Sequence, residues 1–318
     1  MTDGPLALIP HTLRDRAATT LSSELADLAP SLEVRVATTP TETYDGLAEA
    51  SILLAMGFED EWYDHLDTVE WIQALFSGID HLDLERFENE GVTLTNAAGV
   101  HAEPISQQVL GYMLAFERNL HRAIRQQVTG VWERFSAGEL GGKTLGIVGV
   151  GAIGTAIARV CSPYDMEVIG VKRDTSVDIE HIDRLLSPDR LDEVLASADY
   201  LVLACPLTEE TNGLIDASAL RVMGSDSVLI NIARGAVIDE TALAEALQQR
   251  WIRGAALDVF EEEPLPSESP LWGLSNVIIT PHMAGSTPHY WRRCAELVAT
   301  NYELLQAGAL DEFENRVV

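Results

Sequence analysis

The chain alternates short apolar runs with amphipathic stretches. In the first hundred residues the apolar runs have the length of strands, and stretches with helical periodicity separate them. The strands predicted there are PLALI (5–9), LEVRVA (32–37), SILLA (51–55), WIQAL (71–75) and VTLTN (92–96). Such alternation is typical of a parallel sheet covered by helices.

A second alternating region follows a long helical pattern over residues 102–127. Glu103-Pro104 opens that pattern, since proline suits the first turn of a helix. The strands predicted after it are LGIVGV (145–150), MEVIGV (166–171), YLVLAC (200–205), SVLINI (227–232), GAALDV (254–259) and NVIIT (276–280). A final helical pattern at 289–308 fits either sheet. We therefore predict an α/β fold with two doubly wound parallel-sheet domains.

Composition narrows the class of protein. With 47% hydrophobic residues, the chain has the core formers of a globular protein. Its apolar runs are shorter than a membrane span, and its N-terminus has no basic leader, so we expect a cytoplasmic protein without a membrane partner. The three widely spaced cysteines form no paired motif, so we expect no metal site.

The charge of the chain is strongly acidic. Its 50 acidic and 21 basic residues give a formal net charge of −29, which argues against a nucleic-acid partner. Two of the basic residues are lysines, Lys143 and Lys172. Molar salt screens the self-repulsion of such a chain, and its composition resembles proteins of halophilic archaea. We therefore expect a halophilic protein.

A glycine motif predicts a dinucleotide site. Gly149, Gly151 and Gly154 have GxGxxG spacing between a predicted strand and a helix. The first glycine permits a tight turn, the second lets backbone approach a pyrophosphate, and the third allows close packing of helix on strand.

The tip of the next strand indicates which dinucleotide is bound. An acidic residue usually stands there in NAD-binding proteins and binds the ribose 2′-hydroxyl. This chain has Lys172 and Arg173 instead, and these cations attract a 2′-phosphate. We predict NADP(H) as the cofactor, although a solvated pair of cations is the simpler alternative.

Three later motifs place charged side chains after strands. Arg234 lies in INIARG, Glu263 in DVFEEEP and His282 in TPHMAG. Carboxyl ends of strands in an open α/β sheet are where ligands bind, so the three side chains could converge. A protonated His282 supported by Glu263 can give a proton to a ketone that accepts hydride, and Arg234 can hold a carboxylate. The chemistry expected is reduction of a 2-keto acid.

With these motifs in the same order, the chain resembles the D-isomer-specific 2-hydroxyacid dehydrogenases over nearly its full length. The matching segments are SGIDHLD (77–83), NAAGVHAEP (96–104), GVGAIG (149–154), CPLTEETNGLI (205–215), INIARG (230–235), DVFEEEP (258–264) and TPHMAG (280–285). The resemblance implies that Arg234, Glu263 and His282 are the catalytic residues. It also implies a homodimer that acts on a small 2-keto acid or D-2-hydroxy acid.

The same resemblance assigns domains and binding residues. It implies a flavodoxin-like substrate domain of residues 1–98 plus 286–318 and a Rossmann dinucleotide-binding domain of residues 99–285. Backbone amides of Ser77, Gly78 and Ile79, with Arg234, are expected to bind the substrate. The expected cofactor contacts are Gly149, Gly151, Ala152, Ile153, Gly154, Lys172, Arg173, Cys205, Pro206, Thr211, Ile232, Asp258, His282 and Gly285.

Two departures and two alternatives stay open. Relatives often have proline where this chain has Ala98, and Lys172 replaces the usual acid.

One alternative function is a dinucleotide-sensing corepressor, because such proteins retain the same three residues. The other is phosphoglycerate dehydrogenase, which the few cations of the substrate segment disfavour. Formate dehydrogenases share this fold, but the resemblance implies that they have glutamine at the position of Glu263. Glu263 therefore disfavours that activity. Pyruvate-like, hydroxypyruvate, glyoxylate, branched-chain and ketopantoate-like substrates all fit the sequence.

Overall fold

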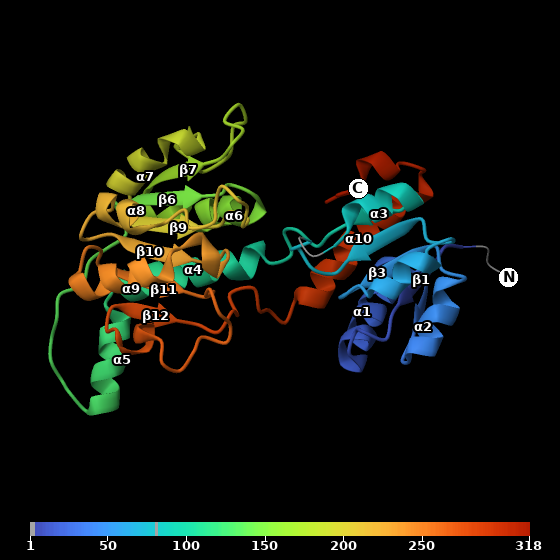
Figure 1. Cartoon of the computed structure of the whole chain (residues 1–318), viewed down its shortest axis with the longest axis horizontal. Coiled ribbons are helices and arrows are strands. Elements are labelled where there is room, and N and C mark those ends of the chain that lie inside the picture. Colours follow the sequence, from blue (N-terminus) through green and yellow to red (C-terminus); the bar gives the residue numbers. More distant parts are fainter. Residues whose placement is uncertain (1–3, 80–81) are drawn as a thin grey trace. The chain divides into compact units, whose positions relative to one another are not determined.

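The computed structural model describes residues 4–79 and 82–318 and divides into two compact units (Figure 1). Unit 1 comprises Met1–Val100 with Thr287–Val318, and unit 2 comprises His101–Ser286. Asp80 and His81 of the SGIDHLD segment lie outside the described residues.

Unit 1 is built on a parallel five-stranded sheet. The strands run in the order β2-β1-β3-β4-β5, which is the flavodoxin-like order. They are β1 (Leu6–Ile9), β2 (Glu33–Val36), β3 (Ile52–Ala55), β4 (Trp71–Ala74) and β5 (Thr93–Thr95). The helices are α1 (Asp15–Leu28), α2 (Pro40–Leu47), α3 (Leu84–Glu90) and α10 (Tyr290–Gln306), with short 3-10 turns η1 (Asp60–His65) and η6 (Leu310–Glu312).

The C-terminal helix α10 packs on unit 1. Its Val298 and Tyr302 are buried with Leu21 and Leu25 of α1 in one apolar cluster. Arg292 adds an ion pair, with 2.8 Å between its Nη1 and Oε2 of Glu24. The helical pattern that fitted either sheet therefore belongs to the first one.

Unit 2 is built on a parallel seven-stranded sheet in the order β12-β11-β10-β9-β6-β7-β8. Read from β8, this is the Rossmann order with one further strand at the far edge. The strands are β6 (Thr144–Val148), β7 (Glu167–Val171), β8 (Arg184–Leu186), β9 (Tyr200–Leu203), β10 (Val228–Asn231), β11 (Gly254–Leu257) and β12 (Val277–Ile279). The prediction of two doubly wound parallel-sheet domains is confirmed.

The helices of unit 2 cover both faces of this sheet, over two separate apolar clusters (Figure 1). They are α4 (Ala102–Glu117), α5 (Leu120–Thr129), α6 (Ala152–Cys161), α7 (Leu191–Ser197), α8 (Ala217–Val222) and α9 (Glu240–Gln249). Short 3-10 turns are η2 (Ser162–Tyr164), η3 (Pro188–Arg190), η4 (Gly235–Val237) and η5 (Pro270–Gly273). Within the described ranges, no helix combines the length and apolar character of a membrane span.

The structure of unit 2 adds two features that the sequence pattern did not reveal. The helical pattern over 102–127 is not one helix, because Asn119 takes a left-handed conformation (φ 52°) and α5 starts anew after it. Strand β8 was missed because it is a three-residue edge strand that begins with the exposed Arg184. So short and half-exposed a segment carries no strand periodicity.

Candidate active site

The GxGxxG turn follows β6 at the point where the strand order of unit 2 reverses, between β6 and β9. Gly149 has φ +99°, and a Cβ there would lie 2.6 Å from the backbone nitrogen of Cys205. A Cβ on Gly154 would collide with the carbonyl oxygen of Gly149. No atom lies within 4 Å of a Cβ added to Gly151, so the start of α6 is open to a ligand. This geometry fits the pyrophosphate of a dinucleotide at a helix N-terminus.

Lys172 and Arg173 lie at the carboxyl end of β7, beside that turn. Lys172 is half-buried, and its Nζ donates a 2.9 Å hydrogen bond to the carbonyl oxygen of Val150. Arg173 is exposed. The nearest acid along the chain, Asp174, accepts hydrogen bonds from the backbone and hydroxyl of Ser176. These bonds lower the pKa of Asp174 and hold its carboxylate within its own turn.

The loop after β9 is held by internal hydrogen bonds. β9 is the neighbour of β6 on the side opposite β7. Thr211 donates from Oγ1 to the carbonyl oxygen of Pro206 at 2.7 Å, and the backbone of Thr208 donates to the same Oγ1 at 2.7 Å. Cys205 is buried at the start of this loop, and burial raises the pKa of its thiol. Ile232, after β10, is buried as well.

His282 and Glu263 meet at the carboxyl ends of β12 and β11. His282 Nδ1 lies 2.7 Å from Glu263 Oε2, and the other carboxylate oxygen accepts a 3.0 Å hydrogen bond from the backbone of Phe260. The His282 side chain is 56% exposed, so its second ring nitrogen is open to a ligand. His282 also has a left-handed backbone (φ 48°), a strained conformation for histidine that is typical of functional sites.

Asp258 holds the turn that carries His282. Its buried carboxylate accepts hydrogen bonds from the backbone of Met283 and Ala284, at 2.9 and 2.8 Å, and from the hydroxyl of Thr280. Its carbonyl oxygen accepts the His282 N–H at 2.8 Å. The expected contact of Asp258 with the cofactor stays a prediction; within the protein, both of its carboxylate oxygens accept hydrogen bonds.

A buried tyrosine extends this network and was missed from the sequence. Tyr112 of α4 lies with its hydroxyl 2.5 Å from Oγ1 of Thr280, and burial raises its pKa. Gly285, at the end of the same turn, packs against His101, where a Cβ would lie 2.7 Å from Nδ1. No sequence motif links residues as distant as Tyr112 and Thr280, so only the fold brings them together.

Arg234 follows β10, the neighbour of β11, and its side chain is exposed. Its Nη1 donates a 2.8 Å hydrogen bond to the carbonyl oxygen of Ala233. Buried Asn231 fixes the turn by donating from Nδ2 to the Arg234 carbonyl oxygen at 2.9 Å. Within the described residues, no hydrogen bond joins Arg234 to Glu263 or His282. The structure therefore pairs the histidine with the glutamate and leaves the guanidinium group open to a ligand.

The segment Ser77–Ile79 of unit 1 lies just after β4, and three successive carbonyl groups at its start, those of residues 75 to 77, accept hydrogen bonds. Leu75 accepts from the hydroxyl of Tyr290, Phe76 from the backbone of Ala97 at 3.0 Å, and Ser77 from Nδ2 of Asn96 at 2.9 Å. These bonds fix the backbone where it enters the segment, and the sequence pattern did not point to the two side-chain donors, Asn96 and Tyr290.

Comparison with known proteins identifies the family. The family profile described as "D-isomer specific 2-hydroxyacid dehydrogenase, NAD binding domain" matches residues 110–284. A glyoxylate reductase of Thermofilum pendens is 37% identical over 264 residues, covering 81% of this chain and 78% of that protein. The chain belongs to the D-isomer-specific 2-hydroxyacid dehydrogenase family. It is accordingly an oxidoreductase of the 2-hydroxyacid dehydrogenase and glyoxylate reductase type, with an NAD(P)-binding domain.

One further sequence relative and one solved structure are similar to this dehydrogenase over most of its length. D-3-phosphoglycerate dehydrogenase of Methanocaldococcus jannaschii is 33% identical over 88% of this chain, but the match covers only 55% of that protein. A family member from Xanthobacter autotrophicus Py2, solved in complex with NADPH and MES, is 29% identical with a TM-score of 0.84. That comparison covers 99% of this chain and 98% of the other.

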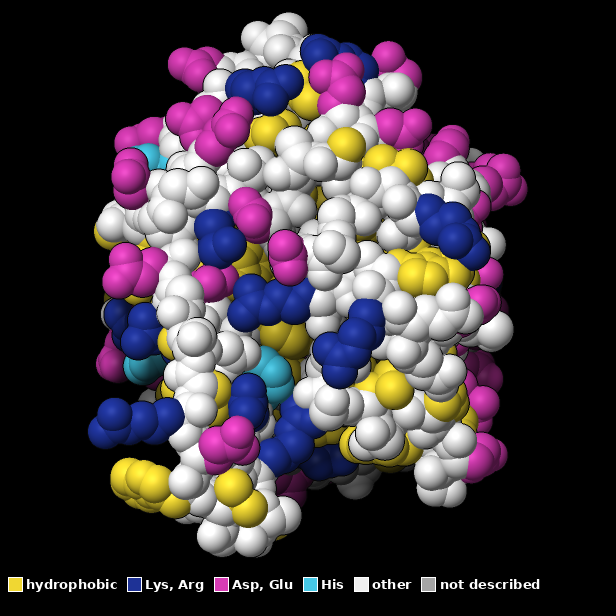
Figure 2. All heavy atoms as spheres, turned by 90° about the vertical axis from the view of Figure 1, so that its left-hand side faces the viewer, with side chains coloured by type: hydrophobic (Ala, Val, Ile, Leu, Met, Phe, Trp, Pro, Cys, Tyr) yellow, Lys and Arg dark blue, Asp and Glu magenta, His cyan; other side chains and the backbone are white. Residues whose placement is uncertain are grey.

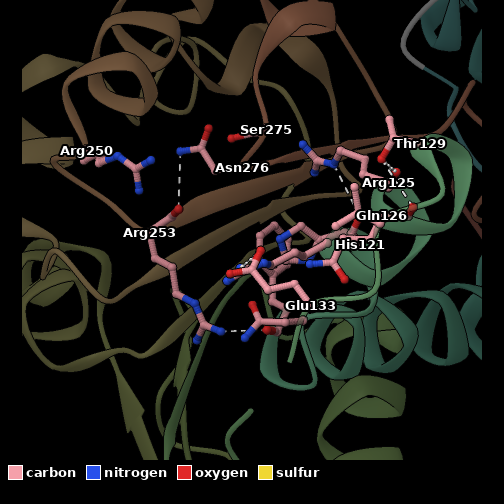
Figure 3. Close-up of a pocket in the computed structure, with 13 residues that line it drawn as sticks. His121, Arg125, Gln126, Thr129, Glu133, Arg250, Arg253, Ser275 and Asn276 are labelled. Carbon is pink, nitrogen blue, oxygen red and sulfur yellow. Dashed lines mark hydrogen bonds and ion pairs between the residues drawn. The ribbon is translucent and has the colours of Figure 1, made fainter. Parts of the chain in front are cut away.

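A pocket of the dehydrogenase lies away from these residues. Figure 3 shows it between α5 and the segments that precede β11 and β12 in unit 2. Glu263 and His282 instead follow the carboxyl ends of those two strands. Because the sheet is parallel, the pocket is at its amino-terminal edge and the candidate active site at its carboxyl edge.

Proposed function

We propose that this dehydrogenase reduces small 2-keto acids to D-2-hydroxy acids with NADPH, using Arg234, Glu263 and His282. The observation that carries the proposal is the 2.7 Å contact between His282 Nδ1 and Glu263 Oε2, beside an open ring nitrogen. Unit 2 serves as the dinucleotide-binding domain and unit 1 as the substrate domain in this proposal.

Each residue has a defined part in the reaction. When bound, the cofactor supplies a hydride to the keto carbon. Protonated His282 donates its Nε2 proton to the keto oxygen, and Glu263 stabilises the imidazolium through Nδ1–H. Arg234 has the planar fork that binds a carboxylate and polarises the neighbouring oxygen. Backbone amides of Ser77, Gly78 and Ile79 add donors for the same carboxylate.

The preference for NADPH rests on the tip of β7. Lys172 and Arg173 stand where an acid would bind a ribose hydroxyl, and the Val150 carbonyl holds Lys172 beside the glycine turn. A 2′-phosphate gains two charge-assisted contacts there. The NADPH bound to the Xanthobacter relative agrees with this assignment.

The substrate proposed first is glyoxylate, because the Thermofilum relative is named a glyoxylate reductase. Phosphoglycerate is a weaker candidate, since the first segment offers few cations for a phosphate, with Arg14, Arg16, Arg35 and Arg86 scattered along it. A role as a dinucleotide sensor makes one distinct prediction, which is binding of NADPH without turnover.

The assembly proposed is a homodimer formed through unit 2. Helix α5 exposes an apolar stripe in which Leu120, Ile124 and Val128 are 47%, 60% and 82% exposed. Trp132, just beyond the helix, is 97% exposed. An apolar stripe of this kind, on so acidic a protein, marks an interaction site. Light scattering at high salt measures whether the dimer forms.

Initial rates test the function directly. NADPH and NADH are compared side by side at high salt over a panel of glyoxylate, hydroxypyruvate, pyruvate, branched-chain keto acids and ketopantoate. We expect turnover of at least one keto acid and a lower KM for NADPH. Turnover with NADH alone would retain the reductase and remove the role of Lys172 and Arg173. Binding of NADPH without any turnover would favour the sensor.

A further inference from the structure

Two hydrogen bonds join helix α4 to the loop that carries His282. The Tyr112 hydroxyl lies 2.5 Å from Oγ1 of Thr280, and the Thr280 hydroxyl donates to Oδ1 of Asp258. A carboxylate oxygen accepts, and a hydroxyl has one hydrogen to give, so Tyr112 is the donor to Thr280. The direction of this chain of bonds is therefore fixed, from the tyrosine to the carboxylate.

The carboxylate at the end of the chain of bonds is buried without a cation. Figure 2 shows acidic side chains spread over one face of the protein, where water solvates them. Asp258 is instead 2% exposed, and within the described residues no basic side chain forms an ion pair with it. Its oxygens accept from the Thr280 hydroxyl and from the backbone N–H groups of Met283 and Ala284. A buried carboxylate is costly to leave short of donors, so it holds each of these donors firmly.

These donors fix the backbone on both sides of His282. Thr280 lies two residues before the histidine, and Met283 and Ala284 follow it directly. The His282 N–H also donates to the Asp258 carbonyl oxygen at 2.8 Å. His282 has φ 48°, a conformation that persists only where its surroundings impose it. If these anchors weakened, the loop would relax and the imidazole would move with it.

Packing holds the tyrosine in place at the start of the chain of bonds. Tyr112 is 3% exposed and belongs to the same buried apolar cluster as Ile232 and Ala284. Burial raises the pKa of its hydroxyl, so the group stays protonated and remains a donor. Because Tyr112 is part of a long helix, the chain of bonds begins on a rigid element, which is where a site is held most precisely.

We propose that Tyr112 is a positioning residue of the reaction, which acts on His282 through Thr280 and Asp258. The inference rests on the proposed function, in which His282 gives a proton to the keto oxygen. Proton transfer needs the donor within hydrogen-bond reach, and a small displacement of a reacting group is costly in rate. NADPH and the substrate carboxylate are bound mainly by other groups. The effect of Tyr112 should therefore fall on kcat and not on KM.

Steady-state kinetics of Tyr112→Phe tests this role, with NADPH and the keto acid that the unmodified protein reduces best. The variant loses the hydroxyl and keeps the ring in the core. We expect kcat to fall about tenfold, as for the loss of one hydrogen bond from the transition state, and both KM values to stay within about twofold.

The matched control is Tyr200→Phe. Tyr200 is a buried tyrosine of the same apolar cluster, and its hydroxyl donates to Oε2 of Glu117 at 2.6 Å. Tyr200 is the first residue of β9, so it lies at the sheet edge opposite the candidate active site. This variant should leave kcat unchanged. An equal fall of kcat in the two variants would mean general damage to the fold and would overturn the proposal.

Variants of Thr280 test the chain of bonds even if Tyr112→Phe fails to fold. Thr280→Val removes the hydroxyl and should lower kcat at least as much as Tyr112→Phe, whereas Thr280→Ser keeps a hydroxyl and should retain most of the rate. Added to Thr280→Val, the Tyr112→Phe change should cause no further fall, because the chain of bonds is already broken. Additive losses would mean that Tyr112 acts by packing alone, which contradicts the proposal.

The NMR signals of the His282 ring test the positioning without turnover. His282→Ala identifies these signals, and we expect them to shift at constant pH in Tyr112→Phe and to stay in place in Tyr200→Phe. If they shift in a protein that reduces no keto acid, the proposed function fails and the positioning of His282 is supported. If kcat and the ring signals are both unchanged in Tyr112→Phe while the unmodified protein turns over, the positioning role is overturned and the reductase remains.

Discussion

His282 Nδ1 lies 2.7 Å from Glu263 Oε2, although each residue belongs to the loop after a different strand. The contact depends on β11 and β12 being parallel neighbours, with Leu257 level with Ile279. Both loops then leave the sheet at the same edge. The buried carboxylate of Asp258 completes the arrangement by holding the backbone of the loop that carries His282.

The His282→Ala variant should lose turnover while it keeps NADPH. General acid–base groups contribute about 10²- to 10⁴-fold to rate, and kcat should fall within that range. Fluorescence titration with NADPH should give a largely unchanged Kd, because His282 is one of many expected cofactor contacts. His181→Ala is the matched control, because His181 is an exposed histidine of the same unit. Full turnover in His282→Ala would remove the acid–base assignment.

The Lys172→Asp, Arg173→Ala variant should bind NADPH much more weakly and NADH about as before. Each lost charge-assisted hydrogen bond costs about 1.5–3 kcal/mol, so the Kd for NADPH should rise by about a hundredfold or more. The control is Lys143→Gln, which changes the other lysine of the chain. Lys143 lies just before β6, and its Nζ is 3.3 Å from Oδ1 of Asp199. Equal losses for NADPH and NADH would mean that the change damages the fold.

The Tyr290→Phe and Asn96→Ala variants should raise KM for the keto acid more than they lower kcat. Tyr290 donates to the carbonyl oxygen of Leu75, and Asn96 donates to that of Ser77. Both bonds fix the backbone where the proposed substrate amides of residues 77–79 begin. Tyr302→Phe is the control, because the Tyr302 hydroxyl also donates to a backbone carbonyl, that of Ser31, from the same helix. Steady-state kinetics separates KM from kcat, and an unchanged KM in both variants would contradict this positioning role.

The sequence predicted the strands of both sheets well because parallel strands buried on both faces form continuous apolar runs. It placed the turns of Lys172, Arg234 and His282 for the same reason, since each follows such a run. It missed β8 and the link from Tyr112 through Thr280 to Asp258. An edge strand buries too little to show a pattern, and a contact between distant residues depends on how helices pack on the sheet.

The Glu117→Ala variant should unfold more easily than the unmodified protein. Glu117 is 4% exposed. It accepts a 2.6 Å hydrogen bond from the Tyr200 hydroxyl and forms an ion pair with Arg253. Removing one partner of a buried pair leaves the other uncompensated and costs about 3–5 kcal/mol. Glu133→Ala removes an exposed partner of Arg122 and should cost less than about 1 kcal/mol. Urea unfolding measures both, and similar values for the two would contradict the buried role of Glu117.

Salt should stabilise the protein if its surface charge is an adaptation to a salt-loaded cell. A net charge of −29 strains the folded state by self-repulsion. The Debye length falls from about 10 Å at 0.1 M salt to about 3 Å at 1 M, so most of that repulsion disappears over this range. We expect the Tm to rise by several degrees between these KCl concentrations. Sucrose at equal osmolarity separates screening from solute exclusion, because it adds no charge. A Tm that stays level or falls in KCl would contradict the halophilic assignment. It would leave the reductase proposal untouched, since that proposal rests on Arg234, Glu263 and His282 and not on the net charge.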